Sequence, residues 1–233
     1  MIKPKRSIIP ALDTTDIVVA ELIVKETTNF DFIGAYKIGG LSLPLKYGLP
    51  RVVERLSQYT DKPFILDYQK AATDIPDTAE LFASVLVDAG ISMAILFPFT
   101  GPAVQSAWTQ ALIDKSITAI IGGEMTHDKF FNKYGGYLDY FSPGEIYTKA
   151  AVAGIRHFVM PGNKPEKIQW YKQMLTSVTH DPITIYSPGL VTQGGEISDS
   201  GKVAGENWHC IVGRALLQAT DIAKTATQLG SQL

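Results

Sequence analysis

The chain has 233 residues, of which 45% are hydrophobic and 19% charged, and its formal net charge at pH 7 is −2. This length fits one large domain or two small ones. The near-neutral charge gives no electrostatic basis for binding nucleic acid or an anionic membrane, and no apolar run approaches the roughly 20 residues of a membrane span.

The cysteine and histidine content predicts a cytoplasmic protein without a metal. The single cysteine, Cys210, permits no internal disulfide, which fits a reducing compartment. It lies in an apolar run at 208–212 and is expected to be a buried structural thiol. The four histidines show none of the spacings of metal ligands, so no metal site is expected.

Short β-rich apolar runs alternate with amphipathic stretches along the chain. The predicted strands are 7–12, 32–38, 63–67, 92–97, 117–122, 156–160, 182–186 and 208–212. The predicted helices include 16–28, 43–58, 77–89, 101–113, 143–153, 164–177 and 214–229. Pro165 suits the first turn of a helix, and Gly90 and Gly154 lie where helices should stop.

This alternation predicts an α/β protein with a (β/α)8 TIM barrel fold. The strands are continuously apolar, as parallel strands covered by helices are. Eight strand–helix units in 233 residues match the size of such a barrel. A doubly wound open sheet is the alternative, but it usually needs fewer strands. No linker or break in composition divides the chain, so residues 1–233 are predicted to form a single domain.

Functional side chains of a (β/α)8 barrel lie at the C-terminal ends of its strands. Charged residues follow several of the predicted strands: Asp13, Lys37, Asp67 with Lys70 and Asp74, Glu124, and Arg214. One charged strand end is explained by solvation at the rim, whereas several that converge on one mouth favour a polar active site.

The acid–base–acid series after strand 3 carries the most chemical information. Asp67, Lys70 and Asp74 follow the apolar run 64–66 within a few residues. Charge this close to a core strand costs free energy unless it is paired or used. The series therefore indicates a proton-transfer group held between two anions. A self-neutralising salt bridge on a loop is the alternative explanation.

Glycine-bearing segments follow strands 7 and 8, where barrels most often bind phosphate. They are 187–195 (SPGLVTQGG) and 211–214 (IVGR). Glycines let backbone N–H groups approach phosphate oxygens closely, and Arg214 can bind a phosphate bidentately. A plain turn-rich loop and an exposed first-turn arginine are the alternatives. Neither G-x-x-x-x-G-K-[ST] nor G-x-G-x-x-G occurs, which disfavours a nucleoside triphosphate or dinucleotide.

In their order and placement these motifs resemble those of the orotidine 5'-phosphate decarboxylase family, through nearly the whole chain. The matching segments are 11–13 (ALD), 37–39 (KIG), 74–78 (DIPDT), 124–127 (EMTH), 164–167 (KPEK), 187–195 and 211–214. The resemblance implies a carboxy-lyase that converts orotidine 5'-phosphate to UMP and CO2 in de novo pyrimidine biosynthesis, without a cofactor.

The resemblance also implies catalytic roles. Asp67 would sit against the substrate carboxylate, and Lys70 would deliver a proton to the carbon that loses CO2. Lys37 would hold the charged network and contact the ribose, as would Asp13. Asp74, together with Thr78, would reach into the site of the neighbouring subunit, which implies a homodimer with shared active sites.

Further residues would bind the substrate. Thr126 and Gln193 would contact the pyrimidine, with Gln193 also near the phosphate, and Gly213 and Arg214 would hold the phosphate. The resemblance extends to substrate contacts at Ile75, Pro188 and Gly194.

The chain departs from the family in the motif after strand 3. The family usually has D-x-K-x-x-D, whereas this chain has D-x-x-K-x-x-x-D. Residues i and i+2 of a strand share a face, so the longer spacing would point Asp67 and Lys70 apart in a regular strand. A bulge at Tyr68-Gln69 is expected to point the side chains of Asp67 and Lys70 toward the same side again.

Two other functions compete with this one. The first is a Mg-dependent keto-sugar-phosphate decarboxylase or synthase of the same superfamily, in which a carboxylate after strand 2 helps to hold the metal. Lys37 at that position opposes cation binding. The second is a catalytically silent phosphate-ligand binding protein. This alternative is disfavoured because the motif after strand 3 retains all three of its charged residues, Asp67, Lys70 and Asp74. The aromatic segment 127–141 is expected to cap the barrel, to pack at a subunit interface or to form an ordinary loop.

Overall fold

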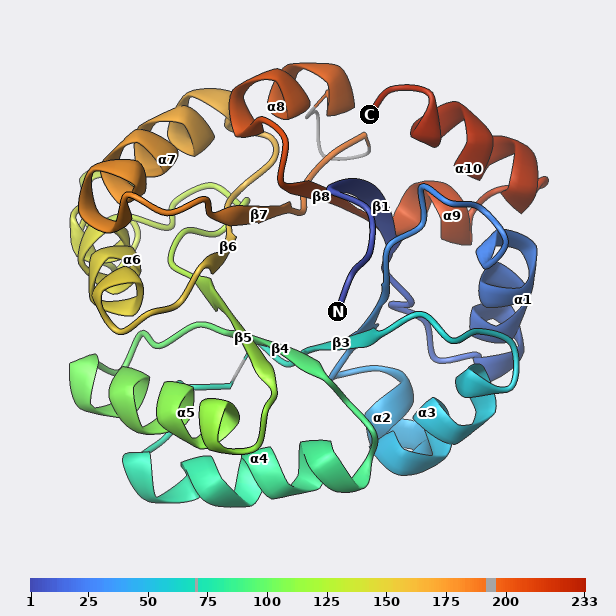
Figure 1. The fold of residues 1–233 in the computed structure, drawn as a ribbon, viewed down its shortest axis with the longest axis horizontal. Helices are drawn as coiled ribbons and strands as arrows, with labels where there is room; N and C mark the ends of the chain where they lie inside the picture. Colours follow the sequence, from blue (N-terminus) through green and yellow to red (C-terminus); the bar gives the residue numbers. More distant parts are fainter. Residues whose placement is uncertain (70, 192–195) are drawn as a thin grey trace.

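The computed structural model describes residues 1–69, 71–191 and 196–233. In this part of the chain eight parallel strands form one sheet, ordered β1-β8-β7-β6-β5-β4-β3-β2. Isolated bridges from Ile8 to Ile33 and from Ala11 to Lys37 bring the two outermost strands together. The strands therefore form the inner ring of a barrel (Figure 1), which confirms the (β/α)8 prediction. They are β1 (Arg6–Pro10), β2 (Tyr36–Gly39), β3 (Phe64–Asp67), β4 (Met93–Leu96), β5 (Thr118–Gly122), β6 (His157–Val159), β7 (Thr184–Ser187) and β8 (Trp208–Val212).

Helices form the outer ring (Figure 1). They are α1 (Ile17–Thr27), α2 (Leu43–Tyr47), α3 (Leu49–Ser57), α4 (Ala79–Asp88), α5 (Pro102–Asp114), α6 (Ser142–Val152), α7 (Pro165–Thr179), α8 (Ile197–Ala204), α9 (Arg214–Leu217) and α10 (Ile222–Gly230). The short 3-10 helices η1 (Pro76–Thr78) and η2 (Asn132–Tyr134) accompany them.

The helices differ from the prediction in three places. The predicted helix 43–58 is divided into α2 and α3 at Gly48, whose φ of +80° lies outside the helical region. The predicted helix 214–229 is likewise divided into α9 and α10. Helix α8 was not predicted at all. The expected stops at Gly90 and Gly154 are confirmed, with φ of +73° and +92° just beyond α4 and α6.

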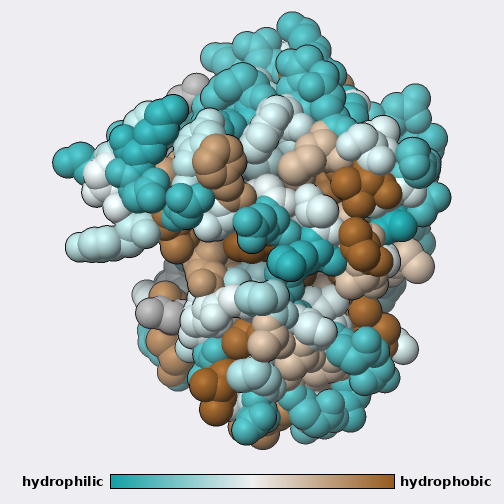
Figure 2. All heavy atoms as spheres, turned by 90° about the vertical axis from the view of Figure 1, so that its left-hand side faces the viewer, coloured by the Kyte–Doolittle hydropathy of each residue, from teal (hydrophilic) through white to brown (hydrophobic). Residues whose placement is uncertain are grey.

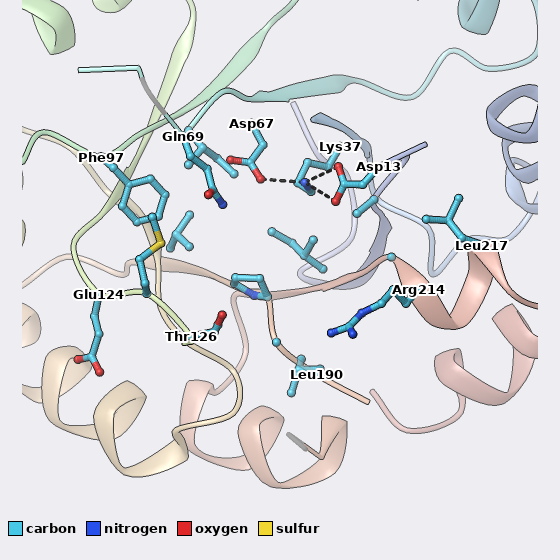
Figure 3. A pocket seen from close by; sticks show the side chains of 18 residues that line it. Asp13, Lys37, Asp67, Gln69, Phe97, Glu124, Thr126, Leu190, Arg214 and Leu217 are labelled. Atoms are coloured by element: carbon cyan, nitrogen blue, oxygen red, sulfur yellow. Dashed lines mark hydrogen bonds and ion pairs between the residues drawn. The ribbon is translucent and has the colours of Figure 1, made fainter. Parts of the chain in front are cut away.

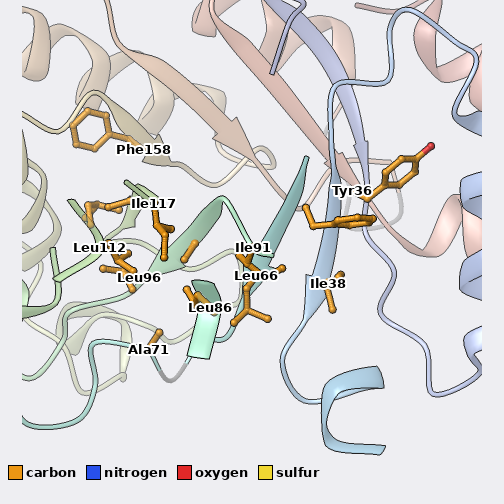
Figure 4. Packing of buried hydrophobic residues seen from close by; sticks show 14 of the residues in the cluster. Tyr36, Ile38, Leu66, Ala71, Leu86, Ile91, Leu96, Leu112, Ile117 and Phe158 are labelled. Carbon is orange, nitrogen blue, oxygen red and sulfur yellow. The ribbon is translucent and has the colours of Figure 1, made fainter. Parts of the chain in front are cut away.

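Alternate residues of each strand face opposite sides of the barrel wall, as the pleat requires. In β3, Phe64 and Leu66 pack outward into the main hydrophobic core, which lies between the strands and helices (Figure 4), whereas Ile65 packs inward. The inner cluster is small and comprises Ile9, Ala11, Ala35, Ile65, Met93, Ile95, Phe97, Ile120, Val159, Tyr186 and Ile211. The inward-facing side chains of the strands thus fill the interior of the barrel below the opening at the C-terminal ends of the strands.

The N-terminal end of the barrel holds a buried polar layer. The Ser7 hydroxyl lies 2.8 Å from His209 Nδ1, and His157 Nδ1 lies 3.1 Å from the Tyr186 hydroxyl. The rings of Tyr186 and His209 are 4.9 Å apart between centroids. Burial, with a smaller effect of His157, lowers the pKa of His209 to about 4. The start of the chain crosses this end of the barrel (Figure 1), where Ile2 packs against the inner cluster.

Cys210 is buried and faces the main core, as expected. Burial raises the pKa of its thiol well above the ordinary value.

None of the helices in the described ranges is long and apolar enough to cross a membrane. On the side of the molecule that carries α6 and α7, hydrophobic side chains lie as separate groups among polar ones (Figure 2).

Candidate active site

A cavity opens at the C-terminal ends of the strands (Figure 3). Polar and charged side chains gather along it, with an apolar floor contributed by the inner cluster. Its lining consists of Ala11, Asp13, Lys37, Asp67, Gln69, Ile95, Phe97, Glu124, Met125, Thr126, Val159, Pro188, Gly189, Leu190, Ile211, Gly213, Arg214 and Leu217. The structure therefore brings together seven of the predicted site residues: Asp13, Lys37, Asp67, Thr126, Pro188, Gly213 and Arg214.

A buried ammonium group lies between two carboxylates on one wall. Lys37 Nζ is 2.8 Å from Asp67 Oδ2 and 3.0 and 3.1 Å from the two carboxylate oxygens of Asp13. The side chains of Lys37 and Asp67 are only 7% and 11% exposed, whereas that of Asp13 is 48% exposed. Burial alone would lower the pKa of Lys37, but attraction to Asp67 and Asp13 outweighs it and raises the pKa above its ordinary value. Lys37 is therefore a permanent cation in the cavity wall.

The strand register assembles this triad. Lys37 lies at an inward position of β2, and Asp67 ends β3 opposite Gly39. Asp13 follows β1, where the backbone of Leu12 bonds to the Lys37 carbonyl at 2.8 Å. A side chain at Gly39 would collide with the Asp13 carboxylate, so glycine is required there.

The lengthened segment after β3 does not form the expected bulge. β3 ends at Asp67, and a turn begins at Tyr68, whose carbonyl accepts a hydrogen bond of 2.6 Å from Ala71 N. Tyr68 packs against the outer core, whereas Gln69 lines the cavity. Lys70 lies outside the described residues, so its predicted role stays a prediction.

The side of the cavity formed by the end of β8, next to Asp13, carries the predicted phosphate site. Gly213 and Arg214 stand where β8 passes into α9, and the Arg214 guanidinium points into the cavity (Figure 3). Within the described ranges Arg214 forms no ion pair. A planar guanidinium in this position can hold a phosphate bidentately. Gln193 and Gly194 lie outside the described residues.

Three predicted site residues do not line the cavity of this chain: Asp74, Ile75 and Thr78. Ile75 is 55% exposed, and Asp74 is also exposed. The carbonyl of Ile75 accepts hydrogen bonds of 2.9 Å from the Thr78 hydroxyl and from Trp108 Nε1. These contacts hold the segment firmly against α5 while its other side faces outward.

Glu124 is a cavity residue whose importance the sequence did not reveal. Its fully buried carboxylate accepts hydrogen bonds from Lys164 Nζ at 2.9 Å and from the Tyr171 hydroxyl at 2.5 Å. Lys164 also donates to the Met125 carbonyl at 3.0 Å, and Asn163 Nδ2 donates to the Thr126 carbonyl at 3.1 Å. This network fixes the backbone that presents Met125 and Thr126 to the cavity.

The aromatic segment 127–141 packs against the mouth. The ring of Phe130 packs at a tilt against that of Phe99, with centroids 5.7 Å apart, and the Phe99 ring in turn lies 5.5 Å from that of Phe97. Phe97 lines the cavity, and its ring occupies the space that a side chain at Gly122 would need. A cap over the barrel, a subunit interface and an ordinary loop were expected as alternatives for this segment. The contact of Phe130 with Phe99 agrees with packing over the barrel.

The described residues contain no group of three or more His, Cys, Asp and Glu side chains that could hold a metal ion. Of the carboxylates that line the cavity, Asp13 and Asp67 are engaged by Lys37, and Glu124 is engaged by Lys164.

A polar cavity at the C-terminal mouth of a parallel eight-stranded barrel, with the buried Lys37 cation in its wall and the Arg214 guanidinium pointing into it, is the arrangement of a TIM-barrel enzyme.

Comparisons with known proteins identify the family. No family model matches the chain. The orotidine 5'-phosphate decarboxylase of Methanococcus maripaludis is 32% identical over 213 residues, which cover 89% of this chain and 88% of the relative. That of Methanosarcina acetivorans is 30% identical over 225 residues, which cover 96% and 92%. The chain belongs to the orotidine 5'-phosphate decarboxylase family.

Solved structures agree on the fold. The crystal structure of the enzyme from Methanocaldococcus jannaschii with the inhibitor BMP matches this chain with a TM-score of 0.83 at 24% identity, and the match covers 98% of each chain.

Proposed function

We propose that this protein decarboxylates orotidine 5'-phosphate to UMP and CO2 without a cofactor. The observation that carries the proposal is the buried Lys37, held between Asp13 and Asp67 in the same cavity as the Arg214 guanidinium, in a chain of this family. A cavity that holds both a fixed charge pattern and a separate guanidinium for a phosphate suits a nucleotide whose reacting group lies away from its phosphate.

The reaction needs electrostatic stabilisation. When the bond between the pyrimidine ring and its carboxylate breaks, the electron pair stays on a ring carbon with no ordinary electron sink. A cation fixed in place before the reaction stabilises that charge at no cost of reorganisation. Asp67 would repel the bound carboxylate, and this repulsion is relieved as neutral CO2 leaves. Lys70 would then protonate the ring carbon.

Binding at the far end would offset the cost of placing the substrate carboxylate near Asp67. Arg214 and Gly213 would hold the phosphate, together with Gln193 and Gly194. Asp13 and Lys37 would contact the ribose, and Thr126 and Pro188 the pyrimidine.

The active form would be a homodimer with shared sites. Asp74, Ile75 and Thr78 face away from the cavity of their own chain, which supports a contribution to a neighbouring subunit's site. The single domain of residues 1–233 and the cytoplasmic location also stay predictions.

The decisive experiment is a UMP-release assay on purified protein with orotidine 5'-phosphate, with and without a chelator. We expect full activity in both conditions, because Lys37 supplies positive charge that a metal would otherwise bring. Activity that vanishes with chelator and returns with Mg²⁺ would favour the keto-sugar-phosphate branch. Tight UMP binding without turnover would favour a silent phosphate-ligand binder.

A further inference from the structure

The segment after β3 places an unassigned polar side chain in the cavity. We propose that the Gln69 side-chain amide donates a hydrogen bond to the carboxylate of orotidine 5'-phosphate and so helps to select the carboxylated nucleotide. This inference rests on the proposed function and adds a residue to its substrate-binding set.

The first support is that side chains before and after the end of β3 line the cavity. Ile65 belongs to the inner cluster, Asp67 lines the cavity, and Gln69 lines it as well. Leu66 and Tyr68 between them both pack against the outer core. Asp67 and Gln69 therefore both reach the cavity, although β3 ends between them, whereas Leu66 and Tyr68 pack on the outer side.

The segment after β2 closely approaches the segment after β3 and holds the Tyr68 side chain on the outer side of the barrel wall, whereas Gln69 lines the cavity. The Tyr68 side chain lies so close to Gly40 that a Cβ on Gly40 would be 2.6 Å from the Tyr68 ring. A backbone hydrogen bond also joins the two segments, since Gly40 N donates to the Asp67 carbonyl at 2.9 Å. Gly40 thus provides the space that the Tyr68 side chain fills, while Gln69 lines the cavity.

The second support is the position of Gln69 along the cavity. Its amide projects into the cavity between Phe97 and Asp67, on the side away from Arg214 (Figure 3). A nucleotide whose phosphate binds Arg214 directs its base toward that side. Gln69 would therefore meet the base and its carboxylate.

The third support is the chemistry of an uncharged donor beside a fixed anion. A substrate carboxylate near Asp67 meets repulsion, and the Gln69 amide offers two N–H donors that bind an anion without adding a charge. A glutamate at this position would instead add to the repulsion. The family pattern has its lysine two residues after the aspartate, and in this chain that position holds Gln69.

The experiment compares Gln69→Met and Gln69→Glu with the wild type. Gln69→Met keeps a similar length but removes the donors, so kcat/KM for orotidine 5'-phosphate should fall about tenfold or more, as for a lost hydrogen bond to a charged group. Gln69→Glu should lower it further through repulsion. The Kd of UMP, which lacks the carboxylate, should change less than about twofold for Gln69→Met.

Tyr68→Phe is the matched control, because the neighbouring side chain packs away from the cavity. It should keep the wild-type kcat/KM, and thermal melts should show that all three variants are folded.

Two results would overturn the inference. Wild-type kcat/KM in folded Gln69→Met would show that the amide makes no contact that matters, and equal losses for orotidine 5'-phosphate and UMP would show that it binds another part of the nucleotide. A wild-type protein that forms no UMP would instead refute the proposed function, and the inference with it.

Discussion

Lys37 Nζ lies 2.8 Å from Asp67 Oδ2, in a pair that is almost completely removed from water. Two buried charges are tolerated because each neutralises the other, although Asp67 Oδ1 is buried without a hydrogen-bond partner in the described part of the chain. The loss of either charge leaves the other uncompensated. Asp13 on the other side of Lys37 is half exposed, so water can solvate its carboxylate. The stability of the cavity wall therefore depends chiefly on the Lys37–Asp67 pair.

Replacing Lys37 with methionine should both destabilise and inactivate the protein. It leaves the Asp67 carboxylate buried without its cation, which costs about 3–5 kcal/mol for a buried pair. Urea unfolding at pH 7 measures this loss. The double variant Lys37→Met with Asp67→Leu should recover most of the stability but no activity. A single variant as stable as the wild type would show that water reaches Asp67 freely.

Arg214→Ala should weaken phosphate binding selectively. The KM for orotidine 5'-phosphate should rise sharply, by about a hundredfold for a lost charge-assisted bidentate contact, whereas turnover of the phosphate-free nucleoside should hardly change. Steady-state kinetics with both substrates measure the difference, and Arg51→Ala, on the surface of α3, is the control. Equal losses for the two substrates would indicate a structural role for Arg214.

His209, in the buried polar layer at the N-terminal end of the barrel, should make the fold sensitive to acid. The pKa of His209 is lowered from 6.5 to about 4, so the unfolded chain binds a proton more readily than the folded one. Stability from this group is fully present above pH 6.5 and is lost as the pH falls from there toward 4. His157, whose pKa burial also lowers, acts in the same direction.

His209→Gln tests this dependence. The variant keeps a polar partner for Ser7 but cannot titrate, so its free energy of unfolding should fall less steeply between pH 6.5 and 4.5 than that of the wild type. Urea unfolding at several pH values gives both slopes. Parallel curves would mean that other groups cause the acid sensitivity.

The shared-site model predicts complementation between two inactive variants. Lys70→Ala should lose many powers of ten in turnover while UMP binding changes modestly, and Asp74→Ala should also be inactive. Mixing them should form heterodimers with one native and one doubly mutated site. Activity should recover toward about one quarter of wild type if subunits exchange randomly.

Mass spectrometry should confirm the exchange of chains in that mixture. If heterodimers form and activity does not return, Asp74 acts in the site of its own subunit. Activity of a few percent in Lys70→Ala alone would show that another group donates the proton.

The barrel could be predicted because hydrophobic periodicity is a local property of the chain. Each strand was a continuous apolar run, and the predicted strand positions overlap all eight observed ones. Helix α8 was not predicted because it is short, includes Gly201 and follows shortly after Gly194 and Gly195 in the sequence. The division of 43–58 at Gly48 was also missed, because isolated glycines inside helical patterns are often tolerated.

The site was predictable where it depends on strand ends and not where it depends on side-chain direction. Asp13, Lys37 and Asp67 converge as the barrel topology requires. The position of Gln69 in the cavity was not predicted, because β3 ends at Asp67 and the strand pattern does not fix the direction of side chains beyond it. The burial of Glu124 depends on Lys164 and Tyr171 from a later part of the chain, and no local pattern shows such a contact.

The burial of Cys210 has a practical consequence. The native thiol is enclosed by the core, and its raised pKa keeps it protonated and therefore a poor nucleophile at neutral pH. Since the chain has no other cysteine, a maleimide dye would label a single cysteine introduced at an exposed position such as Tyr137 without removal of the native one. Fluorophores could thus report on the segment over the barrel mouth in an otherwise unaltered protein.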